Sequence, residues 1–269
     1  MWGTYTLAKI KSCLSVISSK KRVPWRPTQI QEVSPQSICI VLQLTLLEPI
    51  ETERWYGKDV ECPREWEEWL VKERVLPDKL LPEGSDDLFA FRPKKVCAVC
   101  LYRLSFLVHR FKNGRLDVET LMCYFGVADT YTPCHKDLCA SSGQNLMCYT
   151  ENDGSSFWFM TKNRDSSKVT KYFRSLKHEL DHENHFMSVS DLARAPFEVY
   201  VAEQRLGDLV LVPPRSCHQV LNSGGMTIKM SWSRMTLAGL AMALYHELPM
   251  YRRWNTLSIQ ATIRLAYYL

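Results

Sequence analysis

The stretch EQRLGDLVLVPPRSCHQVLNSGGMTIKMSWSRMT, residues 203–236, decides the fold class of this chain. It holds three short runs rich in Val, Leu, Ile and aromatic residues, at 208–212, 218–222 and 227–232, with Gly, Pro and Asn residues between them. Short β-like runs separated by turn residues at such intervals are typical of a sandwich or barrel. The sequence therefore predicts a mainly β fold of the jelly-roll type.

The segments on either side extend this pattern. Four further β-like runs lie at 119–126, 145–150, 157–161 and 197–203. Residues 165–195 are polar and helical in composition, which predicts a helical insertion. Trp66 and Trp69 have helical spacing in a segment bounded by prolines at 63 and 77, so a helix is expected there as well. A last helix should start at Thr236, and its apolar face is predicted to carry Leu237, Leu240, Ala241, Leu244, Tyr245 and Leu248.

Composition narrows the class of protein. The chain has 269 residues, of which 46% are hydrophobic and 23% charged, and this balance excludes disorder or a coiled coil for most of its length. A net charge of +5 does not identify a nucleic-acid binder, and we find no direct nucleic-acid motif. Residues 38–47 are apolar but too short to span a membrane, so no membrane contact is expected.

Cysteine usage and the N-terminus bear on the compartment. Ten cysteines without a recognisable secretory leader favour reduced thiols, so we expect a nuclear or nucleo-cytoplasmic protein that is not secreted. Lys20, Lys21 and Arg22 are either part of an import signal or a solvated basic patch. Cys97 and Cys100 form a CxxC without a second pair at zinc-finger spacing, which predicts no zinc site.

We expect the chain to divide as follows. Residues 1–60 form an irregular N-terminal arm with flanking elements, and 61–116 form a helical lead-in with an atypical insertion near 92–115. Residues 117–250 form the β domain, and 251–269 form a C-terminal tail.

The residues best suited to chemistry are two histidines and an aspartate. The segment 131–137 reads YTPCHKD, and on extended backbone His135 and Asp137 point to the same side. His218 follows a strand and a Pro-Pro break that would deliver it to the mouth of a barrel. Two histidines and one carboxylate form the facial triad that binds Fe(II) and leaves positions open for other ligands. The other interpretation is a surface histidine beside a capping aspartate.

A competing motif lies in the predicted insertion. Residues 178–182 read HELDH and satisfy HExxH, in which two histidines one helical turn apart bind zinc and the glutamate acts as a base. His185 adds a third imidazole nearby. However, the surrounding KHELDHENH is polar on every helical face, whereas such a helix normally buries an apolar face. A zinc metalloprotease is therefore a distant alternative.

Three stretches together resemble the JmjC domain of fungal chromatin-associated proteins: TPCHKDLCASSGQNLMCY, GSSFWFMT and the segment quoted at the start. The resemblance covers about residues 117–250. It implies a double-stranded β-helix, a cupin-like barrel with flanking helices, that binds Fe(II) and 2-oxoglutarate. It also implies hydroxylation or demethylation of lysine on a protein such as a histone tail.

The resemblance assigns roles to individual residues. His135, Asp137 and His218 match the catalytic iron ligands, while Thr132 and Asn145 match residues that contact 2-oxoglutarate. Many members of the family place a lysine at the position of Ser155 to bind the cosubstrate carboxylate. Lys229 is our substitute for that lysine.

The assignment of Lys229 has an alternative, in which it lies on a solvent face while Ile228 and Met230 point inward. The departure at Ser155 and the unusual segment 92–115 leave a second class of function open. In that class the chain is a catalytically weak or inactive JmjC-fold module that binds chromatin or protein.

Overall fold

The computed structural model describes residues 26–27, 31–32, 56–62, 64–74, 76–91 and 121–249. The basic triplet at 20–22, the apolar run at 38–47, the segment 92–115 with its CxxC and the tail 251–269 lie outside the described residues.

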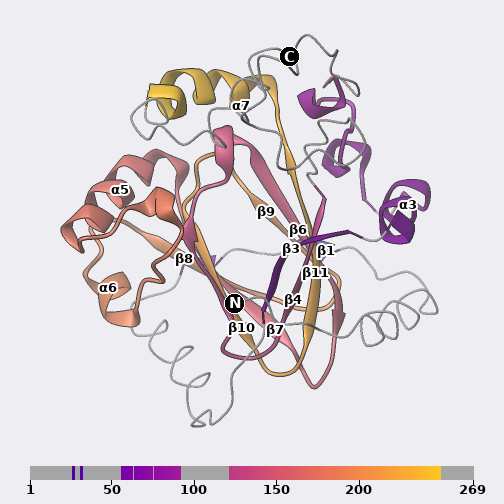
Figure 1. Ribbon diagram of the computed structural model, residues 1–269, viewed down its shortest axis with the longest axis horizontal. Helices are drawn as coiled ribbons and strands as arrows, with labels where there is room; N and C mark the ends of the chain where they lie inside the picture. Colours follow the sequence, from indigo (N-terminus) through magenta and orange to yellow (C-terminus); the bar gives the residue numbers. More distant parts are fainter. Residues whose placement is uncertain are drawn as a thin grey trace, which may run out of the picture.

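Two sheets form the centre of the molecule (Figure 1). The major sheet has the order β1 (Arg26–Pro27), β9 (Asp208–Val212), β6 (Ser142–Thr150), β11 (Thr227–Arg234), β4 (Met122–Gly126) and β3 (Gly57–Glu61). The minor sheet has the order β2 (Gln31–Glu32), β8 (Val199–Gln204), β7 (Ser155–Thr161), β10 (His218–Ser223) and β5 (Tyr131–His135). Every pairing is antiparallel except that of β1 with β9.

This arrangement confirms the predicted fold class, a mainly β protein whose two antiparallel sheets pack as the sandwich of a double-stranded β-helix. All seven predicted β-like runs are strands, with ends that differ by a few residues. Four strands were not predicted: β1 and β2, which are two residues long, β5, which contains Pro133, and β3. The sequence GKDVE of β3 has little of the β-branched and aromatic character on which the prediction relied.

Helix α3 (Arg64–Lys72) covers the outer face of the major sheet, where helical spacing of its tryptophans predicted a helix. Trp66 and Leu70 are buried in one apolar cluster with Ile228 and Met230 of β11. Residues on β11 alternate between the two faces, so Lys229 points into the space between the sheets. The alternative with Lys229 on a solvent face is wrong, because the outer face of this strand is buried under α3.

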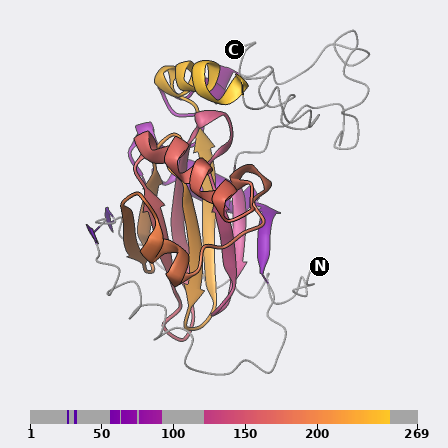
Figure 2. The same ribbon diagram turned by 90° about the vertical axis from the view of Figure 1, so that its left-hand side faces the viewer.

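The predicted insertion covers the outer face of the minor sheet. It contains α5 (Ser166–Ser175), the short turn η6 (Leu180–His182) and α6 (Val189–Arg194), and Figure 2 shows these elements in front of the strands. Phe173 of α5 packs in one cluster with Phe159 of β7 and Leu221 of β10. The insertion is therefore helical as predicted, and it forms part of the apolar packing of the barrel.

The last helix starts where the sequence predicted. The Thr236 hydroxyl accepts a hydrogen bond from the Gly239 amide at 3.1 Å and caps α7 (Leu237–Met242). The helix then widens into the π-helical turn η7 (Ala243–Glu247). The predicted apolar face is confirmed only in part: Leu240 and Leu248 pack in a cluster with Met235. Leu237, Leu244 and Tyr245 are exposed. The wider turn changes which side chains face inward and directs Glu247 into the protein.

Four short turns of 3-10 helix complete the described elements: η1 (Asp78–Leu80), η2 (Leu88–Phe91), η4 (Leu138–Ala140) and η5 (Asn163–Asp165). Within the described ranges, no helix has the length and apolar character needed to cross a membrane.

Candidate metal centre

The two histidines of the predicted triad lie opposite each other on neighbouring strands. β5 and β10 pair in antiparallel register, and His135 is the direct partner of His218. Directly opposed residues on such strands have their Cβ atoms about 5 Å apart. The two imidazole rings accordingly lie with their centroids 4.2 Å apart.

Asp137 joins the histidines because the chain stays extended beyond the end of β5. Its backbone angles are φ −61° and ψ 139°, so its side chain leaves on the same side as that of His135. One possible ligand atom from each of Asp137, His135 and His218 lies within 4.8 Å of the other two. Among the described residues, this is the one group of three or more His, Cys, Asp or Glu side chains so arranged.

A glycine makes room for the carboxylate. A Cβ atom built on Gly143 would lie 2.4 Å from Oδ2 of Asp137, a separation that real Cβ atoms do not show. The same Oδ2 is buried and has no hydrogen-bond partner in the part of the chain that the structure describes. A buried carboxylate oxygen without a partner is costly, and a bound cation would remove that cost.

Backbone carbonyls orient both imidazole rings. Nδ1 of His135 donates to the carbonyl of Pro133 at 2.8 Å, and Nδ1 of His218 donates to the carbonyl of Ser216 at 3.1 Å. With the proton on Nδ1, each ring keeps the lone pair of Nε2 for a metal, which is the usual support of ligating histidines.

Burial sets the charge of the ligands before any metal binds. Burial, and secondly the nearby His218, hold the pKa of His135 well below its usual value, so this ring is neutral at neutral pH. Burial also raises the pKa of Asp137, an effect that His218 opposes. Burial thus disfavours the charged form of both His135 and Asp137, and a bound cation would favour the ionised carboxylate.

The residues present fit Fe(II). Two imidazoles and a carboxylate are the donors of the facial triad, and Oδ2 of Asp137 is available to such an ion. His135, Asp137 and His218 would hold the metal.

The triad lines a pocket between the two sheets, with an empty volume of about 470 Å³ counted out to open solvent. The lining residues are Tyr56, Tyr124, Thr132, His135, Asp137, Gly143, Gln144, Asn145, Trp158, Val212, His218, Val220, Lys229 and Ser231.

Lys229 lies in this pocket with its side chain buried. Its ammonium donates to Oγ of Ser156 at 2.8 Å and to Oδ1 of Asn222 at 2.6 Å. No carboxylate accepts from it among the described residues, and burial lowers its pKa to about 7. The structure thus places a buried cation without a counter-ion in the same pocket as the triad.

Thr132 and Asn145, the other predicted cosubstrate contacts, also line the pocket. The Thr132 hydroxyl shares a hydrogen bond of 2.7 Å with the Tyr56 hydroxyl, and burial raises the pKa of Tyr56. Oδ1 of Asn145 accepts from the Gln204 amide at 3.1 Å. The structure therefore gathers all six predicted site residues around one pocket.

The assignment of Ser155 needs correction. Trp158 of β7 lines the pocket and Ser156 contacts Lys229, so alternation along the strand turns Ser155 to the outer face with Phe157 and Phe159. The β7 residue that contacts Lys229 is Ser156, one position later than the family resemblance indicated.

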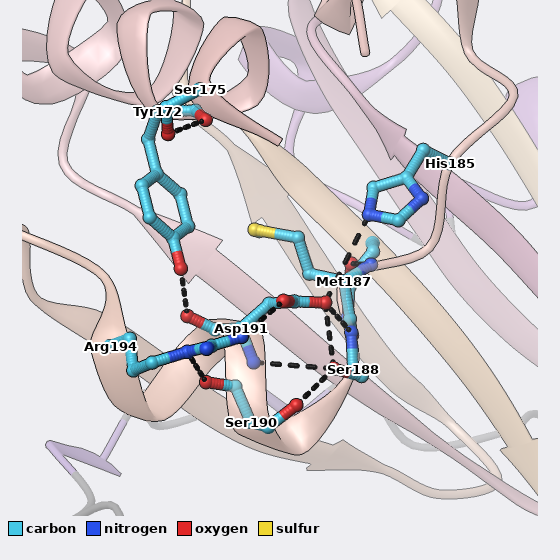
Figure 3. Close-up of polar contacts among 9 residues, drawn as sticks. Tyr172, Ser175, His185, Met187, Ser188, Ser190, Asp191 and Arg194 are labelled. Carbon is cyan, nitrogen blue, oxygen red and sulfur yellow. Dashed lines mark hydrogen bonds and ion pairs between the residues drawn. The ribbon is translucent and has the colours of Figure 1, made fainter. Parts of the chain in front are cut away.

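The HELDH motif does not form the helix that a zinc protease requires. His178 lies after the end of α5, and the only helical turn is η6, from Leu180 to His182. The ring of His178 stacks on that of His185 with centroids 3.8 Å apart. Figure 3 shows His185 turned toward Asp191 at the start of α6, with Nε2 and Oδ2 4.0 Å apart.

Sequence reasoning missed several residues of the pocket. Strand alternation could have identified Ser156, once Trp158 was placed in the interior. Tyr56 carried no local signal, because it lies 76 residues before the threonine that it contacts. Only the packing of β3 beside β4 brings it to the pocket.

A double-stranded β-helix with a His-Asp-His triad is an arrangement that non-haem Fe(II) oxygenases use. Residues 122–233 match the family model described as JmjC domain, hydroxylase. The chain is also 34% identical over 214 residues to C-module-binding factor A of Dictyostelium discoideum. That similarity covers 79% of this chain and 19% of the relative, so the chain spans about a fifth of that protein's length.

Proposed function

We propose that this protein is an Fe(II)- and 2-oxoglutarate-dependent oxygenase. The observation that carries the proposal is the convergence of His135, Asp137 and His218 within 4.8 Å inside a JmjC domain. Bound iron with 2-oxoglutarate would supply the oxidising chemistry that activates dioxygen and hydroxylates a C–H bond. The residues of the chain bind, orient and shield these reactants.

The chain supplies contacts at both ends of a dicarboxylate. At the triad, the Nδ1 hydrogen bonds of His135 and His218 hold the rings so that Nε2 faces the pocket. At the other end, Lys229 offers a charge that Ser156 and Asn222 hold in place. A carboxylate bound to Lys229 would supply the counter-ion that the buried ammonium lacks.

Hydroxyl groups complete the cosubstrate end of the pocket. The paired hydroxyls of Thr132 and Tyr56 can donate to the same carboxylate. Trp158 lies nearly parallel to the His218 ring, with centroids 5.7 Å apart, and excludes water from one side of that ligand. Asn145 offers an amide on the major-sheet side of the pocket.

The substrate belongs to the proposal as well. We propose a lysine of a protein such as a histone tail, either N-methylated and demethylated or hydroxylated directly, and a nuclear or nucleo-cytoplasmic location. The support is the JmjC resemblance, in which hydroxylation of an N-methyl group releases the methyl carbon. The fungal origin of the resemblance remains a prediction, since the relative that matches comes from Dictyostelium discoideum.

One observation favours the second candidate, a module without turnover. The β7 residue next to Lys229 is Ser156 rather than a lysine, and Lys229 of β11 already donates to protein groups. If these contacts persist, the pocket binds 2-oxoglutarate weakly and the domain serves to bind chromatin or protein.

Anaerobic titration with Fe(II) and 2-oxoglutarate tests the proposal. We expect the visible absorption band that the two ligands produce together, and then dioxygen consumption that requires both. His135→Ala should lose both signals, whereas His178→Ala, which changes a histidine of the HELDH motif, should keep them. A band without dioxygen consumption on any lysine peptide would favour the non-catalytic module, and an unchanged band in His135→Ala would refute the metal site.

A further inference from the structure

A buried group of four charged residues lies beside the triad, where four segments of the chain meet. Glu247 of η7 accepts from Lys136 through Oε2 and from Arg215 through Oε1, both at 2.8 Å. Lys136 also lies 3.3 Å from Asp181 of η6. The side chains of Glu247 and Lys136 are 2% and 4% exposed. We call Glu247, Lys136, Arg215 and Asp181 the charge cluster.

The charge cluster holds both chain segments that carry the metal ligands. Lys136 is the residue between His135 and Asp137, and alternation on extended backbone sends its side chain to the side opposite theirs. Arg215 directly precedes Ser216, whose carbonyl accepts the Nδ1 hydrogen bond of His218. One carboxylate thus contacts the residue between His135 and Asp137 and the residue three positions before His218.

The backbone conformation of Arg215 explains why its contact with Glu247 matters. Its φ is +66°, in the left-handed region, which costs a residue other than glycine about 1 kcal/mol or more. The bond from its side chain to Glu247 helps to hold this conformation, and the conformation sets the direction of the Ser216 carbonyl.

Stability alone does not account for the charge cluster. Buried ion pairs are often no more stabilising than apolar side chains of the same size, because removing the charges from water is costly. The widened turn of η7 directs Glu247 inward while Tyr245 and Leu244 stay exposed. The π-helical turn therefore serves to place one carboxylate.

We propose that Glu247 is a positioning residue, which sets the spacing of the metal ligands by holding Lys136 and Arg215. This inference rests on the metal centre of the proposed function. It assigns to the C-terminal helix, which lies beyond residues 122–233 of the JmjC match, a part in building the site.

Two variants of the full chain separate positioning from simple charge effects. Glu247→Gln removes a negative charge, so both positioning and charge predict weaker binding of a cation. Arg215→Gln removes a positive charge near the site. Charge alone would then strengthen cation binding, whereas loss of positioning would weaken it. Arg215 is also the less buried partner, with 16% side-chain exposure, so its variant is expected to fold.

The measurement is Co(II) affinity, followed through the visible bands of bound Co(II) without 2-oxoglutarate or substrate. We expect both variants to bind Co(II) roughly 10- to 100-fold more weakly, with shifted bands, as is usual when residues that orient metal ligands are replaced. Leu70→Ala is the matched control, because it destabilises the core on the outer face of the major sheet and should leave Co(II) affinity unchanged.

Unchanged or tighter Co(II) binding by Arg215→Gln would overturn the positioning role and leave the proposed oxygenase intact. Absence of Co(II) binding by the unaltered chain would overturn both proposals. Equal weakening by Leu70→Ala would also overturn the positioning role, since general destabilisation would then explain the loss.

Discussion

At the scale of single residues, Lys229 shows how a strand can place a cation in a barrel interior. Its neighbours Ile228 and Met230 are apolar, yet they point to the outer face of the major sheet. They do so because α3 covers that face and buries them in an apolar cluster. The polar residues of the strand are left for the space between the sheets. A lysine flanked by apolar residues can therefore be the residue that points to the pocket.

Replacing Lys229 by methionine tests its proposed contact with 2-oxoglutarate. We expect the affinity for 2-oxoglutarate to fall roughly 10- to 100-fold, which corresponds to about 1.5–3 kcal/mol for a lost charge-assisted hydrogen bond. Co(II) affinity should stay near that of the unaltered chain, because Lys229 is not a ligand. Calorimetric titration of each ligand measures both, and unchanged 2-oxoglutarate affinity would contradict the assignment.

The same lysine predicts a pH dependence. In the ligand-free protein burial lowers its pKa to about 7, so the ammonium loses its proton as the pH rises through 7. A neutral amine cannot balance a carboxylate, and 2-oxoglutarate affinity should therefore decrease between pH 6.5 and 8.5. Lys229→Met removes the titrating group, and the difference between the two proteins should shrink as the pH rises. A constant difference across this range would count against the lysine.

At the scale of elements, the helical insertion differs most from its appearance in the sequence. Its composition is polar, yet Phe173 and Leu180 are fully buried against the minor sheet. A few widely spaced apolar residues are sufficient to pack the insertion against the sheet, because each of them is large and all of them reach the same cluster. Leu180, in the middle of the HELDH motif, is one of these buried residues, and it lies in the short turn η6 rather than in an α-helix.

Phe173→Ala measures what the insertion contributes to folding. We expect a loss of about 3–5 kcal/mol in the free energy of unfolding, as for other large buried aromatic side chains. Tyr245→Ala on the exposed side of η7 should change stability by no more than about 0.5 kcal/mol. Urea unfolding of both variants tests this, and a small effect for Phe173→Ala would show that the insertion is a loosely attached surface layer.

At the scale of the whole molecule, the sequence predicted the β architecture and the helices that flank it, but not the contacts between distant segments that complete the pocket. Period-two runs and turn residues predicted seven strands, because each of these signals is local. The six predicted site residues followed from motif spacing and resemblance. Tyr56, Gly143 and Glu247 could not be predicted in the same way, since their roles arise from contacts between distant segments.

The helices that pack on the two sheets determine which fragments of this protein can fold. The JmjC match starts at residue 122 and ends at 233, so it leaves out α3, β3 and the helix that carries Glu247. A fragment of that extent would expose the apolar face around Ile228 and Met230 to water. We expect it to expose a dye-binding hydrophobic surface and to lack a cooperative thermal transition, whereas residues 56–249 should melt cooperatively.

A cooperative transition in the shorter fragment would show that the barrel folds unaided. If the shorter fragment shows no such transition, the segment that matches the family model is smaller than the segment that can fold. The boundaries of the match then show where the sequence resembles the family and not where the chain can fold by itself. The helices outside those boundaries are needed to form the metal centre.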